Sequence, residues 1–502
     1  MVVKLNSISL FGLQALPVEI EVDIQAKVPE FEIVGMAGTM VKESSKRIET
    51  AIQNSGFHFP GKRIIVNLAP AGIRKVGTLF DLPIAIGILA EKYEFAGLES
   101  AVIVGELSLD GTLRPIPGAL PIAVRAKELG AQTVICPAQN AAEMAIVEGI
   151  RAIPASSLFE AAQYLAGERE ITPAVPAADT RSGIGRQTDL LEIKGQEAAK
   201  RALEIAAAGG HNLLLVGPPG TGKTMLARAL PSILPPMELD EALSTTMIYS
   251  VAGLVDPQAP LIRERPFRTP HHTASDTSII GGGRYPRPGE VSLAHNGVLF
   301  MDELQLFRPA VLQVLRQPLE EERIQISRAE GSAEFPANFM LVAALNPSKT
   351  NADLDRWDPA EMRQLLSRIS GPLLDRIDIQ VQLSRIGYDD LRSTAGRENS
   401  ECVRLRVGAA RAVQRDRLAK HGVLTNSQMA HRHIELYCAH SEAAGNLLRL
   451  AMERFHLSIR VHDRILKIAR TIADLEKAEK VAEHHVSEAL QYRVLDRVVS
   501  ML

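Results

Sequence analysis

The sequence predicts an α/β protein with more than one domain, and three observations lead to that prediction. At 502 residues the chain is too long to fold around one hydrophobic core. Short strand-like runs alternate with helical patterns through the first third of the chain. Further on, at residues 213–230, an apolar run passes through a glycine-rich turn directly into a helical pattern. The expected organisation is an α/β domain over residues 1–165, an exposed linker over 166–189, an α/β core over 190–385 and a helical domain over 386–502.

Composition and charge restrict the class of protein. The net charge is −3, so no overall basic field attracts nucleic acid, although a ring-shaped assembly can confine its basic residues to a channel. Cys136, Cys402 and Cys438 are far apart and odd in number, which favours buried thiols in a reducing compartment over disulfides. The N-terminal stretch lacks the charged start and cleavage site of a signal peptide, and no apolar run is long enough to span a bilayer. We therefore expect a cytoplasmic protein without a membrane partner.

Residues 1–165 carry the patterns of a mixed α/β domain. Alternating apolar and polar residues at 18–28 predict a half-buried strand, and the spacing at 41–56 predicts an amphipathic helix that ends at a glycine. Further strand-like and helical runs follow as far as Pro137. The linker prediction for 166–189 depends on a segment rich in Pro, Ala, Gly and charge, which cannot bury much apolar surface.

The glycine-rich turn in GPPGTGKT has the composition and spacing of a phosphate-binding loop. Gly217, Gly220 and Gly222 permit backbone angles that other residues resist, so consecutive N–H groups can point at a phosphate chain. Lys223 would then contact the β- and γ-phosphates, and the hydroxyl of Thr224 would contact Mg²⁺. The helix that follows directs its positive end at the same anion. The pattern therefore predicts an ATP site.

An acidic pair follows a second apolar run, in NGVLFMDELQLF. A buried strand would deliver Asp302 and Glu303 to the carboxyl end of a sheet, where ligands collect in open α/β folds. We expect Asp302 to hold Mg²⁺, usually through water, and Glu303 to polarise the attacking water. The residues expected to bind nucleotide and metal are Gly217, Pro218, Pro219, Gly220, Thr221, Gly222, Lys223, Thr224 and Asp302.

Two further polar residues stand at strand boundaries. Asn346 ends the apolar run FMLVAAL, where its amide could hydrogen-bond both the γ-phosphate and the attacking water. Arg376 precedes another strand-like run, and an arginine there commonly reaches the γ-phosphate bound by a neighbouring subunit. The alternative for Arg376 is a surface ion pair with Asp375 or Asp378, which would contribute little to stability.

The last region is helical. A long amphipathic pattern at 457–476 begins with Arg460, our candidate for an arginine that senses nucleotide, and Arg464 is the competing choice. The arginine-rich pattern at 403–422 favours a surface that forms ion pairs with neighbouring helices, with nucleic-acid contact as the alternative.

The order of these motifs resembles that of the AAA+ ATPases, and more specifically their magnesium-chelatase-like branch. Residues 265–304 resemble the helix-2 insertion of that branch, a hairpin directed into the pore of a ring. Together with VNLAP, FDLPIAIGIL and ARTIADLE, the resemblance extends over nearly the whole chain and points to the ComM/YifB family. It implies a hexameric DNA helicase that uses ATP and Mg²⁺ and promotes branch migration during natural transformation. The implied partners are single-stranded and branched DNA, five further copies of the chain, and recombination proteins.

The first domain resembles the proteolytic domain of Lon and the related ribosomal-protein-S5-like fold, through GELSLDGTLRPIPG. In that family a serine follows a KDGP-type turn and a lysine follows a pair of glycines. The matching positions here are Leu79 and Leu120, whose hydrocarbon side chains offer neither a nucleophile nor a base. We therefore expect a non-proteolytic domain used for binding or assembly.

Two segments are candidates for DNA contact within such a pore. The first places Ile280, Arg284 and Tyr285 around three glycines, so that a cation and an aromatic ring stand together on a mobile tip. The second is a hairpin over 323–339 with Arg328 near its turn. Both could instead be solvent-exposed connectors. For the pair His271 and His272 we prefer hydrogen bonding over metal binding, because adjacent residues seldom face one ion.

The sequence also departs from the family pattern. Relatives commonly carry a cysteine-rich segment beginning NPCPCG after the strand-end asparagine, whereas residues 346–362 contain neither Cys nor His. A structural zinc site is therefore chemically unavailable in that segment. Two other functions fit the same motor core: the motor subunit of a metal chelatase, and an ATPase that remodels proteins.

Overall fold

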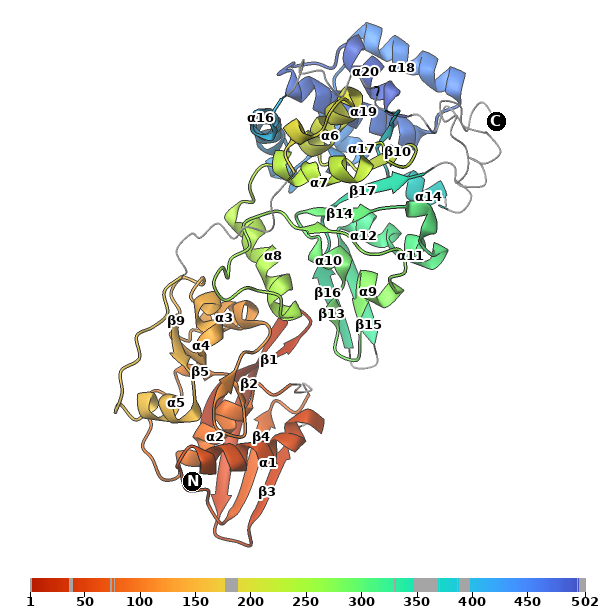
Figure 1. The fold of residues 1–502 in the computed structure, drawn as a ribbon. Helices are drawn as coiled ribbons and strands as arrows, with labels where there is room; N and C mark the ends of the chain where they lie inside the picture. Colours follow the sequence, from red (N-terminus) through yellow and green to blue (C-terminus); the bar gives the residue numbers. More distant parts are fainter. Residues whose placement is uncertain are drawn as a thin grey trace.

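The computed structural model describes residues 2–35, 39–72, 75, 77–176, 188–328, 331–346, 369, 371–385, 387, 398–493 and 495. Its first part is a mixed seven-stranded sheet with the strand order β3-β4-β2-β1-β5-β8-β9 (Figure 1). The strands are β1 (Val2–Phe11), β2 (Gln14–Gln25), β3 (Glu30–Val34), β4 (Arg63–Ala69), β5 (Ala101–Ile103), β8 (Thr133–Pro137) and β9 (Arg151–Ala155), with a separate short pair, β6 (Glu106–Leu107) and β7 (Leu113–Arg114). The helices are α1 (Thr39–Asn54), α2 (Asp81–Leu89), α3 (Ala119–Glu128), α4 (Ala138–Met144) and α5 (Leu158–Leu165).

Apolar patterning explains how this first part packs. After its first residue, Asp81, helix α2 is apolar on every side, and all of its residues are buried. Strand β2 alternates buried and half-buried residues, as expected for a strand with one face on the core. Leu79 and Leu120, at the positions that match the Lon dyad, are both buried, so the apolar side chains are part of the interior.

The second sheet is a parallel sheet of five strands in the order β11-β14-β17-β10-β18. The strands are β11 (Phe267–Arg268), β14 (Val298–Met301), β17 (Met340–Leu345), β10 (Leu213–Val216) and β18 (Ile379–Gln382). Strand β10 is an uninterrupted apolar run because both faces are covered: Leu213 and Leu215 join one hydrophobic cluster, and Leu214 and Val216 join another.

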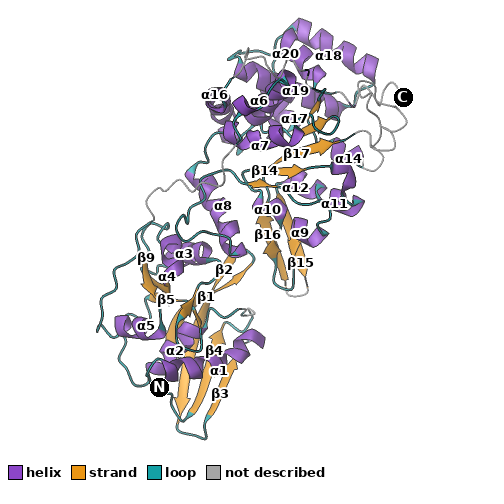
Figure 2. Cartoon of the chain, viewed as in Figure 1, coloured by secondary structure: helices purple, strands orange, loops and turns teal. Residues whose placement is uncertain are grey.

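Helices and two hairpins surround this sheet (Figure 2). The helices of the core are α6 (Glu197–Gly209), α7 (Lys223–Ile233), α8 (Leu239–Ala252), α9 (Asp276–Ile280), α10 (Glu290–Leu293), α11 (Pro309–Val314), α12 (Arg316–Glu321) and α14 (Gly371–Leu374). The first hairpin pairs β12 (Gly281–Gly282) with β13 (Arg287–Pro288), and the second pairs β15 (Arg323–Arg328) with β16 (Gly331–Pro336). In Figure 1 the second hairpin projects away from the sheet, on the side opposite the C-terminal helices.

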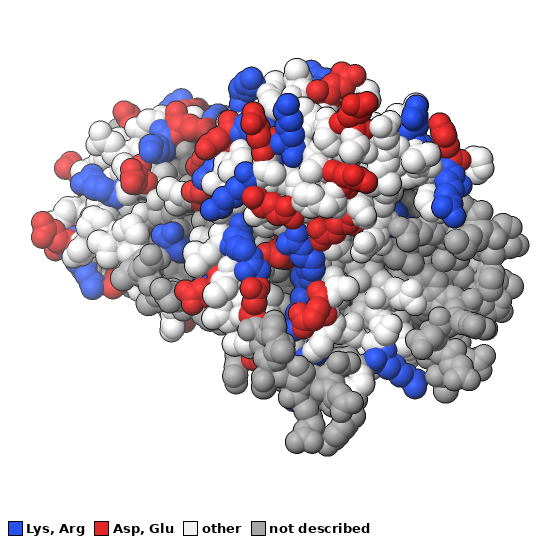
Figure 3. Space-filling view, turned by 90° about the horizontal axis from the view of Figure 1, so that it is seen from above, with Lys and Arg blue, Asp and Glu red and all other residues white. Residues whose placement is uncertain are grey.

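The C-terminal helices pack against α6 and α7 and share the hydrophobic cluster on that side of the parallel sheet. They are α16 (Ser400–Leu418), α17 (His431–Tyr437), α18 (Glu442–Phe455), α19 (Ile459–Leu475) and α20 (Glu483–Gln491), and we refer to them as the lid. The arginines of α16 form the expected ion pairs, such as Arg406 with Glu398 and Arg415 with Glu238. Figure 3 shows cations and anions interspersed over the lid face of the molecule, without a patch of one sign among the coloured residues.

The predicted α/β fold class with a helical C-terminal region is confirmed. The structure corrects one detail, because Cys402 is exposed while Cys136 and Cys438 are buried as expected. Cys402 lies in the first turn of α16, where its side chain meets solvent. Among the helices that the structure describes, none is both long and apolar enough to cross a membrane.

Candidate nucleotide-binding site

The phosphate-binding loop joins the carboxyl end of β10 to the start of α7. Gly220 and Gly222 have φ angles of 80° and 90°, which residues with a Cβ rarely adopt. A Cβ at Gly217 would lie 2.6 Å from the carbonyl oxygen of Leu383, so the close approach of these two segments requires glycine. These constraints explain why the turn carries glycine at those positions, and they leave the N terminus of α7 facing the loop.

Lys223 is the first residue of α7, and its side chain lies back along the loop. Its Nζ donates hydrogen bonds to the carbonyl oxygens of Gly217 at 2.8 Å and Pro218 at 2.7 Å. Burial lowers the pKa of Lys223, while the negative charges of Asp302 and Glu303 act in the opposite direction. The ammonium group is therefore held inside the loop by two carbonyl groups that a bound anion could replace.

Four further side chains meet at the same carboxyl ends of the strands. The hydroxyl of Thr224 donates to Asp302 Oδ2 at 3.0 Å. Glu303 has a φ of 51°, and its backbone N–H donates to Asp302 Oδ1 at 3.0 Å. The amide of Asn346 donates to Glu303 Oε1 at 3.3 Å. The structure thus brings together Lys223 and all four of these side chains, each predicted from a separate stretch of sequence.

The donor set fits a nucleotide with Mg²⁺. Thr224 Oγ1 and the carboxylate of Asp302 are hard oxygen ligands of the kind Mg²⁺ prefers, and they already lie within hydrogen-bond distance of each other. Asn346 Oδ1 is buried and has no hydrogen-bond partner within the described residues, although buried polar atoms are normally satisfied. That oxygen is available to a donor that arrives with the ligand, such as the attacking water.

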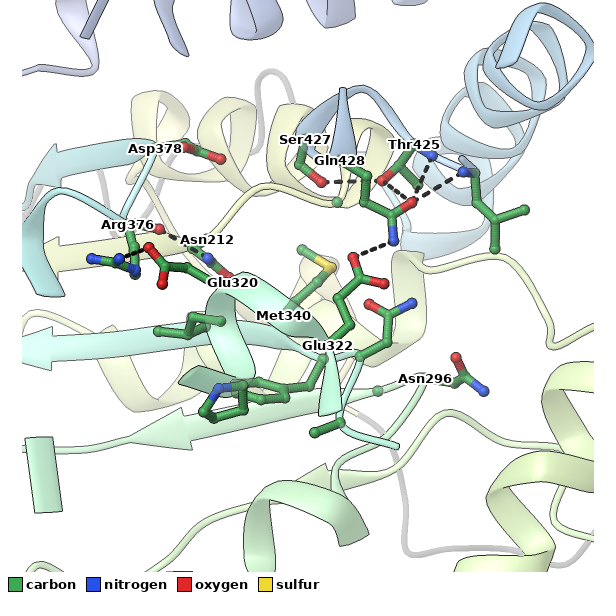
Figure 4. Close-up of a pocket in the computed structure, with 18 of the residues that line it drawn as sticks. Asn212, Asn296, Glu320, Glu322, Met340, Arg376, Asp378, Thr425, Ser427 and Gln428 are labelled. Carbon is green, nitrogen blue, oxygen red and sulfur yellow. Dashed lines mark hydrogen bonds and ion pairs between the residues drawn. The ribbon is translucent and has the colours of Figure 1, made fainter. Parts of the chain in front are cut away.

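The two predicted arginines lie at the opposite ends of the strands, the amino ends. Arg376 comes just before β18, and its carbonyl oxygen accepts a hydrogen bond from Asn212, the residue before β10. Because each strand residue rises ~3.3 Å, the four residues of β10 separate the amino ends of the strands from the phosphate loop by about 13 Å. Arg376 and Arg460 line a cavity of about 480 Å³ at the amino ends of the strands. Figure 4 shows part of its lining, with Arg376 labelled.

Arg376 has a different partner from the ones considered from sequence. Its guanidinium forms an ion pair with Glu320 of α12, and neither Asp375 nor Asp378 is its recorded partner (Figure 4). The sequence could not show this pairing, because it depends on how α12 packs beside the start of β18. Burial lowers the pKa of Arg376, and the charges of Arg464, Arg316 and Arg460 lower it further. Several arginines therefore lie close together on this side of the cavity, and Glu320 pairs with one of them.

The competing lid arginines differ in their surroundings. Arg464 is largely buried and its Nε lies 3.3 Å from Asp378 Oδ1. Arg460 is exposed, and the described part of the chain contains no recorded hydrogen bond or ion pair to its guanidinium. Arg460 is therefore the arginine that can reach a second molecule, whereas Arg464 helps to hold the lid.

A buried polar network fixes the lid to the core beside these arginines. His211 is fully buried, with Nδ1 3.0 Å from Asp378 Oδ2 and Nε2 2.9 Å from Thr471 Oγ1 on α19. Burial alone would raise the pKa of Asp378, but the hydrogen bond from His211 and the charge of Arg464 outweigh it and lower the pKa. Asp378 is thus an ionised anchor shared by the core and the lid.

The residues suggested for DNA contact gather around the two hairpins. Arg284 places its guanidinium 5.8 Å from the ring centroid of Tyr285. A Cβ at Gly282 would lie 3.3 Å from Arg328 Nη2, so the tips of the two hairpins are neighbours. Ile280 ends α9 and is partly buried against the apolar cluster beneath the hairpins, so it supports the loop and does not project from it.

The histidine pairs take part in hydrogen bonds. The Nδ1 of His271 and the hydroxyl of Thr273 form one at 2.8 Å, in agreement with the loop interpretation. Within the described residues, one group has three potential metal ligands close together: Glu476, His484 and His485. The Nδ1 of His485 accepts the backbone N–H of Ala482, and the Nε2 atoms of both histidines lie 3.0 Å from Glu476 Oε2. These contacts connect the start of α20 to the end of α19.

Two residues near the site were missed from sequence. Gln305 accepts the backbone N–H of Asn346 through Oε1 at 3.4 Å, and its position two residues after Glu303 could have suggested a role. Arg316 begins α12 and contributes to the positive charge around Arg376, and its buried Nε has no hydrogen-bond partner among the residues that the structure describes. No local pattern in the sequence marks Arg316, because its nearness to Arg376 depends on packing.

Sequence comparisons accord with this arrangement. Family models match three stretches: "Subunit ChlI of Mg-chelatase" matches residues 20–140, "Magnesium chelatase, subunit ChlI" matches 189–391, and "Magnesium chelatase, subunit ChlI C-terminal" matches 397–493. A Salmonella typhimurium protein named YifB is 42% identical over 494 residues, which cover 97% of this chain and 96% of the relative. The chain belongs to the ComM/YifB family of magnesium-chelatase-like AAA+ proteins.

Two other relatives of this ComM/YifB chain match nearly all of it and about half of it, respectively. The "Competence protein ComM" of Haemophilus influenzae is 42% identical over 503 residues, covering 98% of this chain and 97% of the relative. "Lon protease 2" of Bacillus subtilis is 24% identical over 275 residues, covering 47% of this chain and 48% of the relative. The cysteine-rich segment of the family pattern corresponds here to residues 347–362, which lie outside the described residues.

Proposed function

We propose that this chain is the ATP-hydrolysing subunit of a ring-shaped DNA helicase that drives branch migration while transforming DNA is integrated by homologous recombination. The observation that carries the proposal is the division of the site. The side chains expected at the nucleotide meet at the carboxyl ends of the strands: Lys223, Thr224, Asp302, Glu303 and Asn346. The candidate arginines lie at the amino ends. Both candidate arginines therefore lie away from the phosphate loop of their own chain, and a neighbouring copy can bring an arginine to the γ-phosphate.

Each of these side chains has a defined task in the proposal. Lys223 and the loop amides hold the phosphates, while Thr224 and Asp302 hold Mg²⁺. Bound Mg²⁺ neutralises charge on the transferred phosphate. The carboxylate of Glu303 accepts a proton from the attacking water, and Asn346 orients that water. Arg376 and Arg460 reach the nucleotide of the next subunit in a homohexamer.

The two hairpins support DNA as the substrate. Two cations and an aromatic ring lie on the neighbouring hairpins, from Arg284, Tyr285 and Arg328. Proteins bind single-stranded nucleic acid with such groups, because the cations contact phosphates and the aromatic rings stack on bases. The name "Competence protein ComM" of one near full-length relative agrees with a role on incoming DNA.

The deciding experiment is ATP turnover against a panel of nucleic acids. The purified chain should hydrolyse ATP faster with single-stranded or branched DNA, and it should resolve three- and four-stranded junctions in an ATP-dependent manner. Lys223→Ala is the matched control that should lose both activities. An ATPase that responds to unfolded protein and ignores every DNA structure would contradict the proposal.

Assembly is tested separately. Sedimentation with a non-hydrolysable ATP analogue and an oligonucleotide should yield a hexamer bound to DNA. If every condition gives single, unliganded chains, the shared site and the helicase proposal both fail.

A further inference from the structure

The first domain touches the second hairpin through the turn between β1 and β2. Gly12, in that turn, has a φ of 60°, and a Cβ placed on it would lie 2.8 Å from the Cβ of Ala333. Gly331 opens β16, and a Cβ there would lie 3.0 Å from the ring of Phe11. Two glycines therefore allow two distant parts of the chain to approach more closely than side chains would permit.

This contact lies at the tip of the hairpin. Gly331 pairs in register with Arg328, the residue suggested for DNA contact. Behind the tip, Ile326 and Phe335 are buried in an apolar cluster, and the side chains of Phe11 and Leu13 pack against that same cluster. An isolated two-stranded hairpin is marginally stable in water, so its order depends on what covers its apolar face. Part of that cover comes from the first domain.

A second contact holds the first domain to the core. The backbone N–H of Gly118 donates to the carbonyl oxygen of Ser250 at 2.9 Å, near the end of α8. The N–H of Leu120 donates to Glu143 Oε1 at 2.9 Å and lies 3.4 Å from Ser250 Oγ. Ser250 and Glu143 are both buried. Leu120 stands at the position that matches the catalytic lysine of Lon. In this chain the same position, at the start of α3, contacts the core.

The two contacts restrict different motions. The contact at Ser250 fixes the end of α8, which precedes the segment that carries the first hairpin. The contact at Phe11 fixes the tip of the second hairpin. Because the contacts lie on separate elements, the first domain cannot rotate about one of them without breaking the other.

We propose that the first domain, no longer a protease, is a brace that positions the β15–β16 hairpin for its ligand, through Phe11 and Gly12 at the tip and Ser250 at the end of α8. The part of this inference that concerns DNA rests on the proposed function. The bracing itself does not, since it predicts the order of the hairpin with or without DNA.

Hydrogen exchange of the full-length chain tests the brace. Phe11→Ala should speed exchange of the β15–β16 amides about tenfold or more, because it removes an apolar cover from the tip. The matched control is Phe159→Ala, which removes a ring packed 5.8 Å from Phe57 within the same domain. Faster hairpin exchange in Phe11→Ala alone supports the brace. Equal hairpin exchange in wild type and Phe11→Ala overturns it.

A pair of substitutions tests the contact between Gly12 and Ala333 directly. Gly12→Ala places a Cβ 2.8 Å from the Cβ of Ala333, so the hairpin has to move away and its amides should exchange several-fold faster. Ala333→Gly removes the overlapping atom, so adding Gly12→Ala to that chain should change hairpin exchange much less. The control is Gly56→Ala, which has a similar φ of 82° and no described neighbour within 4 Å of its added Cβ, and it should leave the hairpin unchanged. Equal effects of Gly12→Ala in the two backgrounds would overturn the proposed contact.

ATPase assays connect the brace to the ligand. Phe11→Ala should retain basal ATP turnover within about twofold, and its stimulation by single-stranded DNA should fall several-fold. A wild-type enzyme that ignores DNA would contradict the proposed function and leave hydrogen exchange to decide the brace. Unchanged DNA stimulation in a Phe11→Ala chain whose hairpin exchanges faster would refute the brace as a positioning device.

Discussion

The side-chain amide of Asn346 donates a hydrogen bond to the carboxylate of Glu303 across 3.3 Å and joins the ends of two neighbouring parallel strands. Glu303 follows β14 and Asn346 follows β17, so the parallel pairing of these two strands brings the two side chains together. The hydrogen bond also restrains the carboxylate, because the amide occupies one oxygen that would otherwise accept a proton from water. The same asparagine keeps a buried oxygen without a recorded partner.

Replacing Glu303 should separate nucleotide binding from hydrolysis. Glu303→Gln keeps the size of the side chain and an oxygen that can accept from Asn346, but it removes the group that takes a proton. We expect ATP binding within a few-fold of wild type and hydrolysis reduced about 100-fold or more. Phosphate release and fluorescent-nucleotide titration measure the two quantities. Lys223→Ala should instead lose binding, and a Glu303→Gln chain that loses binding as well would contradict the assigned role.

Mixing two inactive variants should restore activity if the site is shared between subunits. Arg376→Ala alone should bind ATP and lose hydrolysis about 10³-fold or more, since it removes transition-state charge. Mixed with Lys223→Ala, it should regain turnover, because some interfaces then combine an intact loop with an intact arginine. Arg460→Ala should behave in the same way. Arg376→Ala monomers that hydrolyse ATP normally would show that the arginine is not needed in trans.

The contiguous motifs were the part of the site that the sequence could predict. The phosphate loop and the pair Asp302 and Glu303 each lie within a few residues of one strand end, so local spacing determines their placement. The parallel sheet then aligns the strand ends. Asn346 was also predictable, because it directly follows an apolar run of strand length.

Contacts between distant segments could not be predicted in this way. Nothing in the sequence around Arg376 indicates that Glu320 is its partner, because the pair depends on the packing of α12. The same holds for Gly12 and Ala333, which meet only when the first domain lies against the hairpin. Glycine in a turn and alanine in a strand are common, so neither residue indicates this contact before the fold is known.

Removing His211 should destabilise the junction between core and lid. His211→Ala leaves the buried carboxylate of Asp378 with one hydrogen-bond partner fewer and leaves Thr471 without its ring partner. Breaking a buried pair of this kind costs about 3 kcal/mol. The control is His431→Ala, which removes an exposed histidine paired with Asp463 and should change stability much less. Thermal unfolding with lid fluorescence probes should show the difference, and equal effects of the two variants would count against the network.

Acidification should weaken the packing between α8 and the start of β17 through His295. This histidine is buried, its Nδ1 accepts the backbone N–H of Asn338 at 3.1 Å, and its Nε2 lies 3.3 Å from Ser244 Oγ. Burial lowers its pKa from 6.5 to about 4, although the charge of Glu241 acts to raise it. The neutral ring is the form that the fold accepts. Its contribution to stability is therefore complete above pH 6.5 and is lost as the pH falls from 6.5 towards 4.

Integrated over that window, the linkage amounts to about 3 kcal/mol. His295→Asn removes the titrating group and keeps a side chain that can hydrogen-bond, so its stability should fall less than that of wild type between pH 7 and pH 4.5. Urea unfolding at several pH values measures the difference, with His431→Ala as a variant that keeps His295. Parallel losses in wild type and His295→Asn would place the acid sensitivity in other groups, because carboxylates elsewhere are unchanged by the substitution.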